Sequence, residues 1–185
     1  MLNPVLDVRY LPGFVPDPAA LLARVRQELQ WESRMRARQT VSYGLAYNYS
    51  GMVYPDVPMP GFLAELAQAV ERVVGHPITN CLGNLYETGE STMGFHSDSA
   101  VGLGPETSTS IVSLGAVRSL TFRLKASREH TRAVALEPGS LLVMAPAVQD
   151  LWMHAVLPSA ETSPRVSLTF RHVLGRGANG ELRAS

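Results

Sequence analysis

The sequence has little that could cross-link the chain or form a thiolate metal site. Cys81 is the only cysteine among 185 residues, which excludes an intramolecular disulfide and a zinc site built from thiolates. An excess of charge of either sign is also missing, because 16 Lys and Arg balance 16 Asp and Glu. This balance excludes a partner held mainly by overall positive charge, although it is compatible with a local basic patch.

Long apolar runs are missing as well. No run approaches the roughly 18 residues that a membrane span needs, and residues 1–9 hold no basic segment followed by an apolar one. We therefore expect no membrane partner and a cytoplasmic protein. With 45% hydrophobic and 17% charged residues the chain can bury an ordinary core. At about 150 residues per domain, its length predicts one domain, and we expect a monomer.

The N-terminal part predicts two amphipathic helices. Apolar residues recur about every 3.6 residues in segments 17–31 and 60–74, and Gly75 follows the second segment as a helix C-cap. The segment between them, 40–54, is rich in Tyr, Val and Thr and predicts a β-hairpin.

After residue 78 the pattern changes to short β-type runs separated by Gly, Pro or Ser. These runs are 80–86, 110–114, 119–124, 133–136, 140–144, 151–157 and 165–173. Short strands at regular spacing indicate a β-sandwich or a jelly roll. We expect a mainly β domain with N-terminal helices over residues 1–174, followed by a loose polar tail at 175–185.

Two of the five histidines fit a metal site. His96 and Asp98 are two residues apart, so on a strand or at its end their side chains share a face. His154 lies in an alternating segment, and in a jelly roll a distant strand can return a second histidine to the same place. Two His and one carboxylate with three open positions form the facial triad of non-haem Fe(II) oxygenases. The alternative is a loop histidine beside an aspartate and a separately satisfied core histidine.

Residues 165–171 alternate strictly between polar and apolar side chains. Arg165, Ser167, Thr169 and Arg171 would share one face of a strand, with Val, Leu and Phe on the other. A surface strand explains this pattern. If the polar face instead points into a barrel, its two guanidinium groups need a compensating anion. Guanidinium groups bind carboxylates in a bidentate manner, so a dicarboxylic co-substrate would supply that anion.

The ordered set of motifs resembles the AlkB family of Fe(II)- and 2-oxoglutarate-dependent dioxygenases. The set covers about residues 38–173 and consists of Asn84-Leu85-Tyr86, His96-x-Asp98, segments 110–115 and 138–142, His154 and Arg165-x-Ser167 continuing to Arg171. The resemblance implies that His96, Asp98 and His154 bind Fe(II). It also implies a 2-oxoglutarate site formed by Asn84, Tyr86, Arg165, Ser167 and Arg171, with O2 as the second co-substrate.

The family fold is a double-stranded β-helix, which is a jelly roll, with an N-terminal region that forms a nucleotide-recognition lid. The resemblance implies such a lid at about residues 30–54, where Tyr47 and Tyr49 resemble the family's aromatic substrate-side hairpin. With Arg38 they are the candidate substrate-binding residues, because a flipped base needs aromatic stacking and phosphate contacts. Two core tyrosines of a hairpin and a solvated basic face are the alternatives.

Two positions depart from the family pattern. Ser167 stands where members usually carry Asn, and its hydroxyl can still bond a neighbour. The DNA-repair members place acidic residues just after the iron-binding Asp, where they read the exocyclic amine of the damaged base. This chain instead has Ser99, Ala100, Val101 and Gly102.

The resemblance implies oxidative dealkylation of N-alkylated bases in DNA or RNA. The alkyl carbon on a ring nitrogen is hydroxylated while 2-oxoglutarate becomes succinate and CO2, and the hemiaminal then releases an aldehyde. An alternative directs the same oxygenase chemistry at a protein side chain or a small molecule, which the neutral charge and the missing acidic residues favour. A non-catalytic jelly-roll binding module is a third hypothesis, against which the complete triad and the arginine pair argue.

Overall fold

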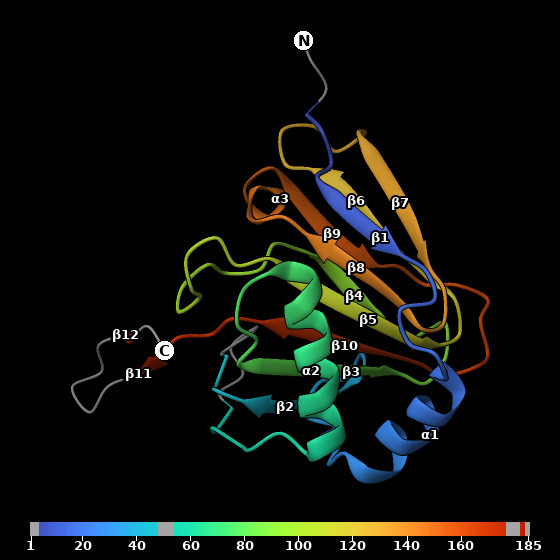
Figure 1. The fold of residues 1–185 in the computed structure, drawn as a ribbon. Helices are drawn as coiled ribbons and strands as arrows, with labels where there is room; N and C mark the ends of the chain where they lie inside the picture. Colours follow the sequence, from blue (N-terminus) through green and yellow to red (C-terminus); the bar gives the residue numbers. More distant parts are fainter. Residues whose placement is uncertain (1–3, 48–53, 177–181, 184–185) are drawn as a thin grey trace.

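Two antiparallel sheets form the body of the molecule (Figure 1). The structure is a computed structural model that describes residues 4–47, 54–176 and 182–183. The larger sheet has the order β1 (Val8–Leu11), β8 (Ser140–Met144), β5 (Thr109–Gly115), β10 (Arg165–Arg171), β3 (Asn80–Tyr86) and β2 (Gln39–Gly44). The smaller sheet has the order β4 (Met93–His96), β9 (Trp152–Val156), β6 (Arg118–Leu124) and β7 (Thr131–Leu136). The predicted mainly β jelly roll is confirmed.

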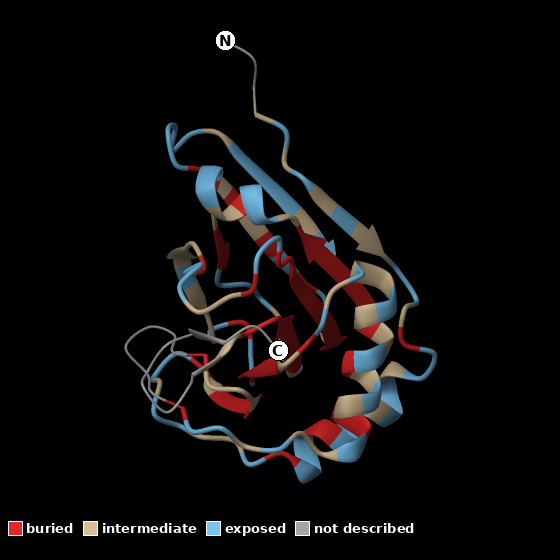
Figure 2. Cartoon of the chain, turned by 60° about the vertical axis from the view of Figure 1, so that its left-hand side comes forward, coloured by how far each residue is buried: buried red, intermediate tan, exposed pale blue. Residues whose placement is uncertain are grey.

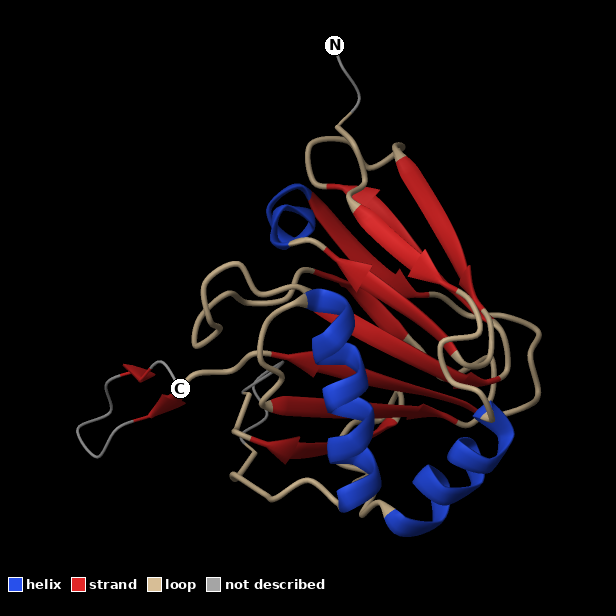
Figure 3. Ribbon diagram, viewed as in Figure 1, coloured by secondary structure: helices blue, strands red, loops and turns tan. Residues whose placement is uncertain are grey.

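Both predicted helices are present and cover one face of the larger sheet (Figure 3). Helix α1 (Pro18–Glu28) begins after Asp17, whose carboxylate accepts a hydrogen bond from the Ala20 backbone N–H at 3.0 Å. Helix α2 (Gly61–Val74) ends at Gly75, which adopts the left-handed conformation with φ of 77°. Within the described ranges, no helix has the length and apolar character that a membrane crossing requires.

The alternation of β10 separates two environments inside the fold. Val166, Leu168 and Phe170 pack into the core between the larger sheet and helices α1 and α2. The polar side chains of β10 point the other way, toward the smaller sheet, and are also buried. Figure 2 shows this buried interior between exposed outer surfaces. The surface-strand interpretation of residues 165–171 is therefore wrong, and the strand instead forms a polar inner wall.

Of the expected hairpin at 40–54, the described residues form one strand, β2, and the chain that follows returns to the end of β2 through an antiparallel bridge between Gly44 and Val57. β2 pairs with β3, with Tyr43 opposite Cys81, and the chain before β2 returns to it through a bridge between Glu32 and Thr40. The composition of the segment favours a strand but cannot identify its distant partner. Residues 48–53, which include Tyr49, lie outside the described residues.

Five further elements were not expected from the sequence pattern. β1 and β4 have only four residues each, which is too short for a clear alternation. The six-residue helix α3 (Pro146–Leu151) lies between β8 and β9. The tail expected to be loose contains β11 (Gly175–Arg176), which pairs with β12 (Leu182–Arg183).

Candidate active site

The two candidate histidine ligands face each other across neighbouring strands. β4 and β9 are antiparallel partners, and their register places His96 directly opposite His154. The two imidazole rings lie with their centroids 4.3 Å apart. The smaller sheet therefore supplies both histidines from strands more than 50 residues apart in the sequence.

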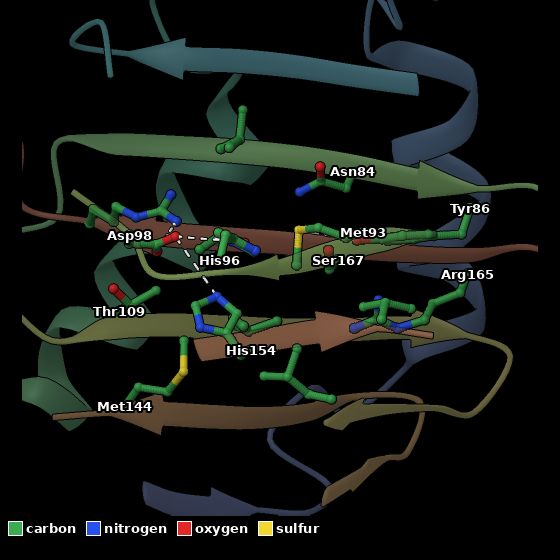
Figure 4. A pocket seen from close by; sticks show the side chains of 16 residues that line it. Asn84, Tyr86, Met93, His96, Asp98, Thr109, Met144, His154, Arg165 and Ser167 are labelled. Atoms are coloured by element: carbon green, nitrogen blue, oxygen red, sulfur yellow. Dashed lines mark hydrogen bonds and ion pairs between the residues drawn. The ribbon is translucent and has the colours of Figure 1, made fainter. Parts of the chain in front are cut away.

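Asp98 completes the cluster from the loop that follows β4 (Figure 4). Its Oδ1 atom lies 3.4 Å from His96 Nε2 and 3.8 Å from His154 Nε2. Its backbone N–H donates to Gln149 Oε1 at 2.9 Å, and its Oδ2 accepts from Arg171 Nη2 at 2.5 Å. The first contact holds the Asp98 backbone and the second holds Oδ2, which leaves Oδ1 facing both imidazole rings.

The cluster fits a divalent metal ion. Ligand atoms about 2.1 Å from one ion lie about 3 Å apart when they subtend a right angle, which is close to the spacing of these three side chains. Asp98 Oδ1 is buried and has no hydrogen-bond partner among the described residues, so an acceptor is left for a ligand. Two nitrogens and one carboxylate oxygen are the donor set of a non-haem Fe(II) centre with open positions.

The charges of the ligands are those that metal binding requires. Burial lowers the pKa of His154 to about 4, despite the opposing effect of Asp98. Burial alone would raise the pKa of Asp98, but Arg171 and the neighbouring histidines outweigh it and hold that pKa well below its usual range. At neutral pH the site therefore presents a neutral His154 and an ionised Asp98.

Arg165 lies at the other end of the same pocket (Figure 4). The side chain is almost fully buried, its Nε donates to Ser113 Oγ at 3.0 Å, and its Cζ lies 5.2 Å from the centroid of the Tyr86 ring. Its Nη1 has no hydrogen-bond partner in the part of the chain that the structure describes. A buried cationic donor without a partner is suited to a carboxylate that enters the pocket.

Asn84 and Ser167 stand between the metal cluster and Arg165. They are directly opposite each other on β3 and β10, and Tyr86 is opposite Arg165 two residues further along. All four side chains line one pocket together with the three candidate metal ligands and Arg171. The structure thus brings together every residue that the sequence predicts for iron and 2-oxoglutarate.

The buried charges of the described residues fit an anionic co-substrate. Four arginines are buried, whereas Asp98 is the only buried carboxylate, and the arginines are Arg38, Arg118, Arg165 and Arg171. A bound metal would add further positive charge. A dicarboxylate such as 2-oxoglutarate would balance this excess, while an unpaired buried cation is costly. The residues present therefore fit both the metal and 2-oxoglutarate.

The candidate substrate residues are placed differently from the expectation. Arg38 is not on a solvated face, because it is buried and donates from Nε to Asn84 Oδ1 at 2.7 Å. Tyr47 is 2% exposed, its hydroxyl donates to the Ser99 carbonyl at 2.9 Å, and the Arg171 Cζ lies 4.6 Å from its ring centroid. The side chains of Arg38 and Tyr47 are thus buried and hydrogen-bonded next to the site. Tyr49 lies outside the described residues.

Arg118 is a further buried residue of the site, and the sequence analysis assigned it no role. The side chain is buried and donates to four backbone carbonyls around the Tyr86 end of the pocket, those of Thr88, Gly89, Ser91 and Leu157. The available signal was its position, because Arg118 shares the alternation phase of the buried residues Leu120 and Phe122. Gln149, the anchor of Asp98, gave no signal in the sequence.

Comparisons with known proteins agree with this geometry. The sequence model of the 2OG-Fe(II) oxygenase superfamily matches residues 8–171. The chain is 34% identical over 177 residues to the mouse "DNA oxidative demethylase ALKBH2", covering 91% of this chain and 71% of that protein. Its identity to the human protein of the same name is 35% over 177 residues, covering 91% and 65%.

Two further comparisons extend the similarity. The human "Alpha-ketoglutarate-dependent dioxygenase alkB homolog 3" is 30% identical over 184 residues, covering 88% of this chain and 64% of that protein. The chain therefore spans about two thirds of the length of these relatives. "The structure of OsALKBH1" shares the fold with a TM-score of 0.65 at 15% identity, covering 92% of this chain and 100% of that one. The chain thus belongs to the 2OG-Fe(II) oxygenase superfamily and is an AlkB-like, Fe(II)- and 2-oxoglutarate-dependent dioxygenase.

Proposed function

We propose that this dioxygenase removes alkyl groups from ring nitrogens of bases in DNA or RNA. The observation that carries the proposal is the enclosed pocket in which the His96, Asp98 and His154 cluster meets the arginine wall of β10. The mouse and human relatives named as DNA oxidative demethylases align with 91% of the chain.

The proposed reaction balances without a further reductant. An N-methyl base, O2 and 2-oxoglutarate give the N-hydroxymethyl base, succinate and CO2, with one oxygen atom in the hydroxyl group and the other in succinate. The carbon–nitrogen bond then breaks, its electron pair goes to the ring nitrogen, and the hydroxyl proton is lost as formaldehyde forms. The ring nitrogen takes up a proton. Bound Fe(II) would supply the activation of O2.

Residues of this chain position the 2-oxoglutarate co-substrate. The metal cluster and the Arg165 guanidinium lie at two ends of one pocket, which suits a co-substrate that carries a carboxylate at each end. Apolar side chains close the wall between them, including Leu120, Met144 and Val156. This wall excludes water, which strengthens the charge interactions inside and protects the reactive centre.

A second pocket opens next to the metal cluster and provides room for a substrate. It shares Asp98 and Thr109 with the first pocket, and the loop after Asp98 and helix α3 form its walls. A group held there would lie next to the metal ligands. Lys125, which lines this second pocket, supplies a positive charge for a nucleic-acid backbone.

One observation favours the alternative, hydroxylation of a protein side chain or a small molecule. Ala100 lines the second pocket where a base-reading acidic residue would be expected, and its neighbour Val101 is 79% exposed. These two apolar side chains offer no hydrogen-bond acceptor to a base amine, which suits a different substrate.

The test is incubation of the purified protein with Fe(II), 2-oxoglutarate and oligonucleotides that carry N-methylated bases. We expect the mass of a methylated oligonucleotide to fall by one methylene per lesion, with succinate formed in equal amount. The His96→Ala variant and an unmodified oligonucleotide serve as controls. If the wild-type protein decarboxylates 2-oxoglutarate but neither alters nor binds any oligonucleotide at low salt, the dealkylase proposal is wrong and the alternative replaces it.

A further inference from the structure

Arg38 makes an unusual contact for an arginine in an arginine-rich connecting segment. It is 7% exposed, whereas Arg34 and Arg36 of the same segment are exposed. Its Nε donates to the side-chain oxygen of Asn84 at 2.7 Å, and its Nη1 donates to the Thr92 carbonyl at 3.4 Å. Arg38 therefore contacts Asn84 in the pocket wall without lining the pocket itself.

This contact decides which way the Asn84 amide points. A guanidinium group can only donate hydrogen bonds, so the amide oxygen of Asn84 must face Arg38. The amide NH2 group then remains for the pocket that Asn84 lines. In the flipped orientation the amide oxygen would face the pocket, where it would repel a carboxylate. We infer that Arg38 is a positioning residue that keeps Asn84 oriented as a hydrogen-bond donor to 2-oxoglutarate.

The register of the larger sheet places this donor where a carboxylate would need it. Asn84 and Tyr86 are two residues apart on β3, so their side chains share a face, and Arg165 is opposite Tyr86 on β10. The Asn84 amide and the Arg165 guanidinium therefore belong to the same pocket wall (Figure 4). Arg38 also reinforces the positive field at this wall from a segment far away in the sequence.

An indirect role of Arg38, acting through Asn84, has different consequences from a direct role. If Arg38 acts through Asn84, removal of the Arg38 side chain weakens 2-oxoglutarate binding only when Asn84 is present. If Arg38 instead binds a phosphate, its removal weakens oligonucleotide binding and leaves the affinity for 2-oxoglutarate unchanged. If Arg38 has a purely structural role, Arg38→Met lowers the stability of the protein, and its effect is the same with and without Asn84.

The experiment is a double-mutant cycle on co-substrate binding in the full chain. Mn(II) replaces Fe(II) so that no turnover occurs, and isothermal titration calorimetry measures the Kd of 2-oxoglutarate for wild type, Arg38→Met, Asn84→Ala and the double variant. Because no nucleic acid is present, the result does not depend on the proposed function. The matched control is Arg36→Met, an exposed arginine two residues away.

We expect Arg38→Met to weaken 2-oxoglutarate binding about 10-fold, equivalent to about 1.4 kcal/mol. The double variant should bind as Asn84→Ala does, and Arg36→Met should bind as wild type does. In turnover with Fe(II), the KM for 2-oxoglutarate should rise while kcat at saturating 2-oxoglutarate stays constant. Arg38→Lys, which retains a donor, should restore part of the affinity and replaces Arg38→Met if that variant does not fold.

Two results would overturn the inference. An equal loss of affinity from Arg38→Met with and without Asn84 would show that Arg38 does not act through the amide. An unchanged Kd in Arg38→Met and Arg38→Lys, with weaker oligonucleotide binding, would restore the phosphate-binding interpretation.

Discussion

Tyr47 offers the sharpest test of how the N-terminal segment serves the site. Its hydroxyl bonds the carbonyl of Ser99, directly after the metal ligand Asp98, and its ring covers the Arg171 guanidinium. Burial raises the pKa of Tyr47, so the hydroxyl remains a donor at neutral pH. Tyr47→Phe removes only the hydrogen bond, and Tyr47→Ala also removes the buried ring.

The expected magnitudes follow from these contacts. One hydrogen bond contributes about 1 kcal/mol to stability, which corresponds to a Tm lower by about 2–4 °C in a chain of this size. Loss of a buried aromatic ring costs about 3–5 kcal/mol, or roughly 6–20 °C. Because the ring also covers Arg171, Tyr47→Ala should weaken 2-oxoglutarate binding together with stability.

The assay compares thermal unfolding, 2-oxoglutarate binding with Mn(II), and demethylation of an oligonucleotide. Tyr10→Phe is the matched control, since Tyr10 accepts one hydrogen bond from the Glu137 backbone N–H at 3.1 Å and lines neither pocket of the site. We expect it to lower the Tm slightly and to leave 2-oxoglutarate binding unchanged. If Tyr47→Ala keeps the wild-type Tm and 2-oxoglutarate affinity but loses demethylation alone, the ring stacks on a base and the reasoning is refuted.

Three other predictions concern the site and the core. Asp98→Ala and His96→Ala should both abolish 2-oxoglutarate turnover, but only Asp98→Ala removes the buried carboxylate beside Arg171 and should cost about 3–5 kcal/mol in urea unfolding; equal losses would contradict this. Arg165→Ala should weaken 2-oxoglutarate binding by about 10- to 100-fold in calorimetry, and an unchanged Kd would mean that this guanidinium does not bind a carboxylate. Burial raises the pKa of the Cys81 thiol, so a thiol reagent should label it only after denaturation; rapid labelling of native protein would disprove this burial.

Features that depend on the residues of a single helix or strand could be predicted from the sequence. The helices at 17–31 and 60–74 were predicted from apolar spacing, and their observed ends lie within three residues of those limits. The two faces of β10 followed from its strict alternation, although the sequence could not tell which face was buried. In the structure both are buried, because the helices cover one face and the smaller sheet covers the other.

Side-chain type and spacing along single strands were enough to suggest the chemistry of the site, because they limit what a strand can bind. His96 and Asp98 on one short segment, with Arg165 and Arg171 on another, indicated a metal and a dicarboxylate. Which charged side chains support the site without lining it could be seen in the three-dimensional fold alone. Arg38 contacts a partner 46 residues away, and burial of a cation depends on such distant partners, which no local pattern of charge reveals.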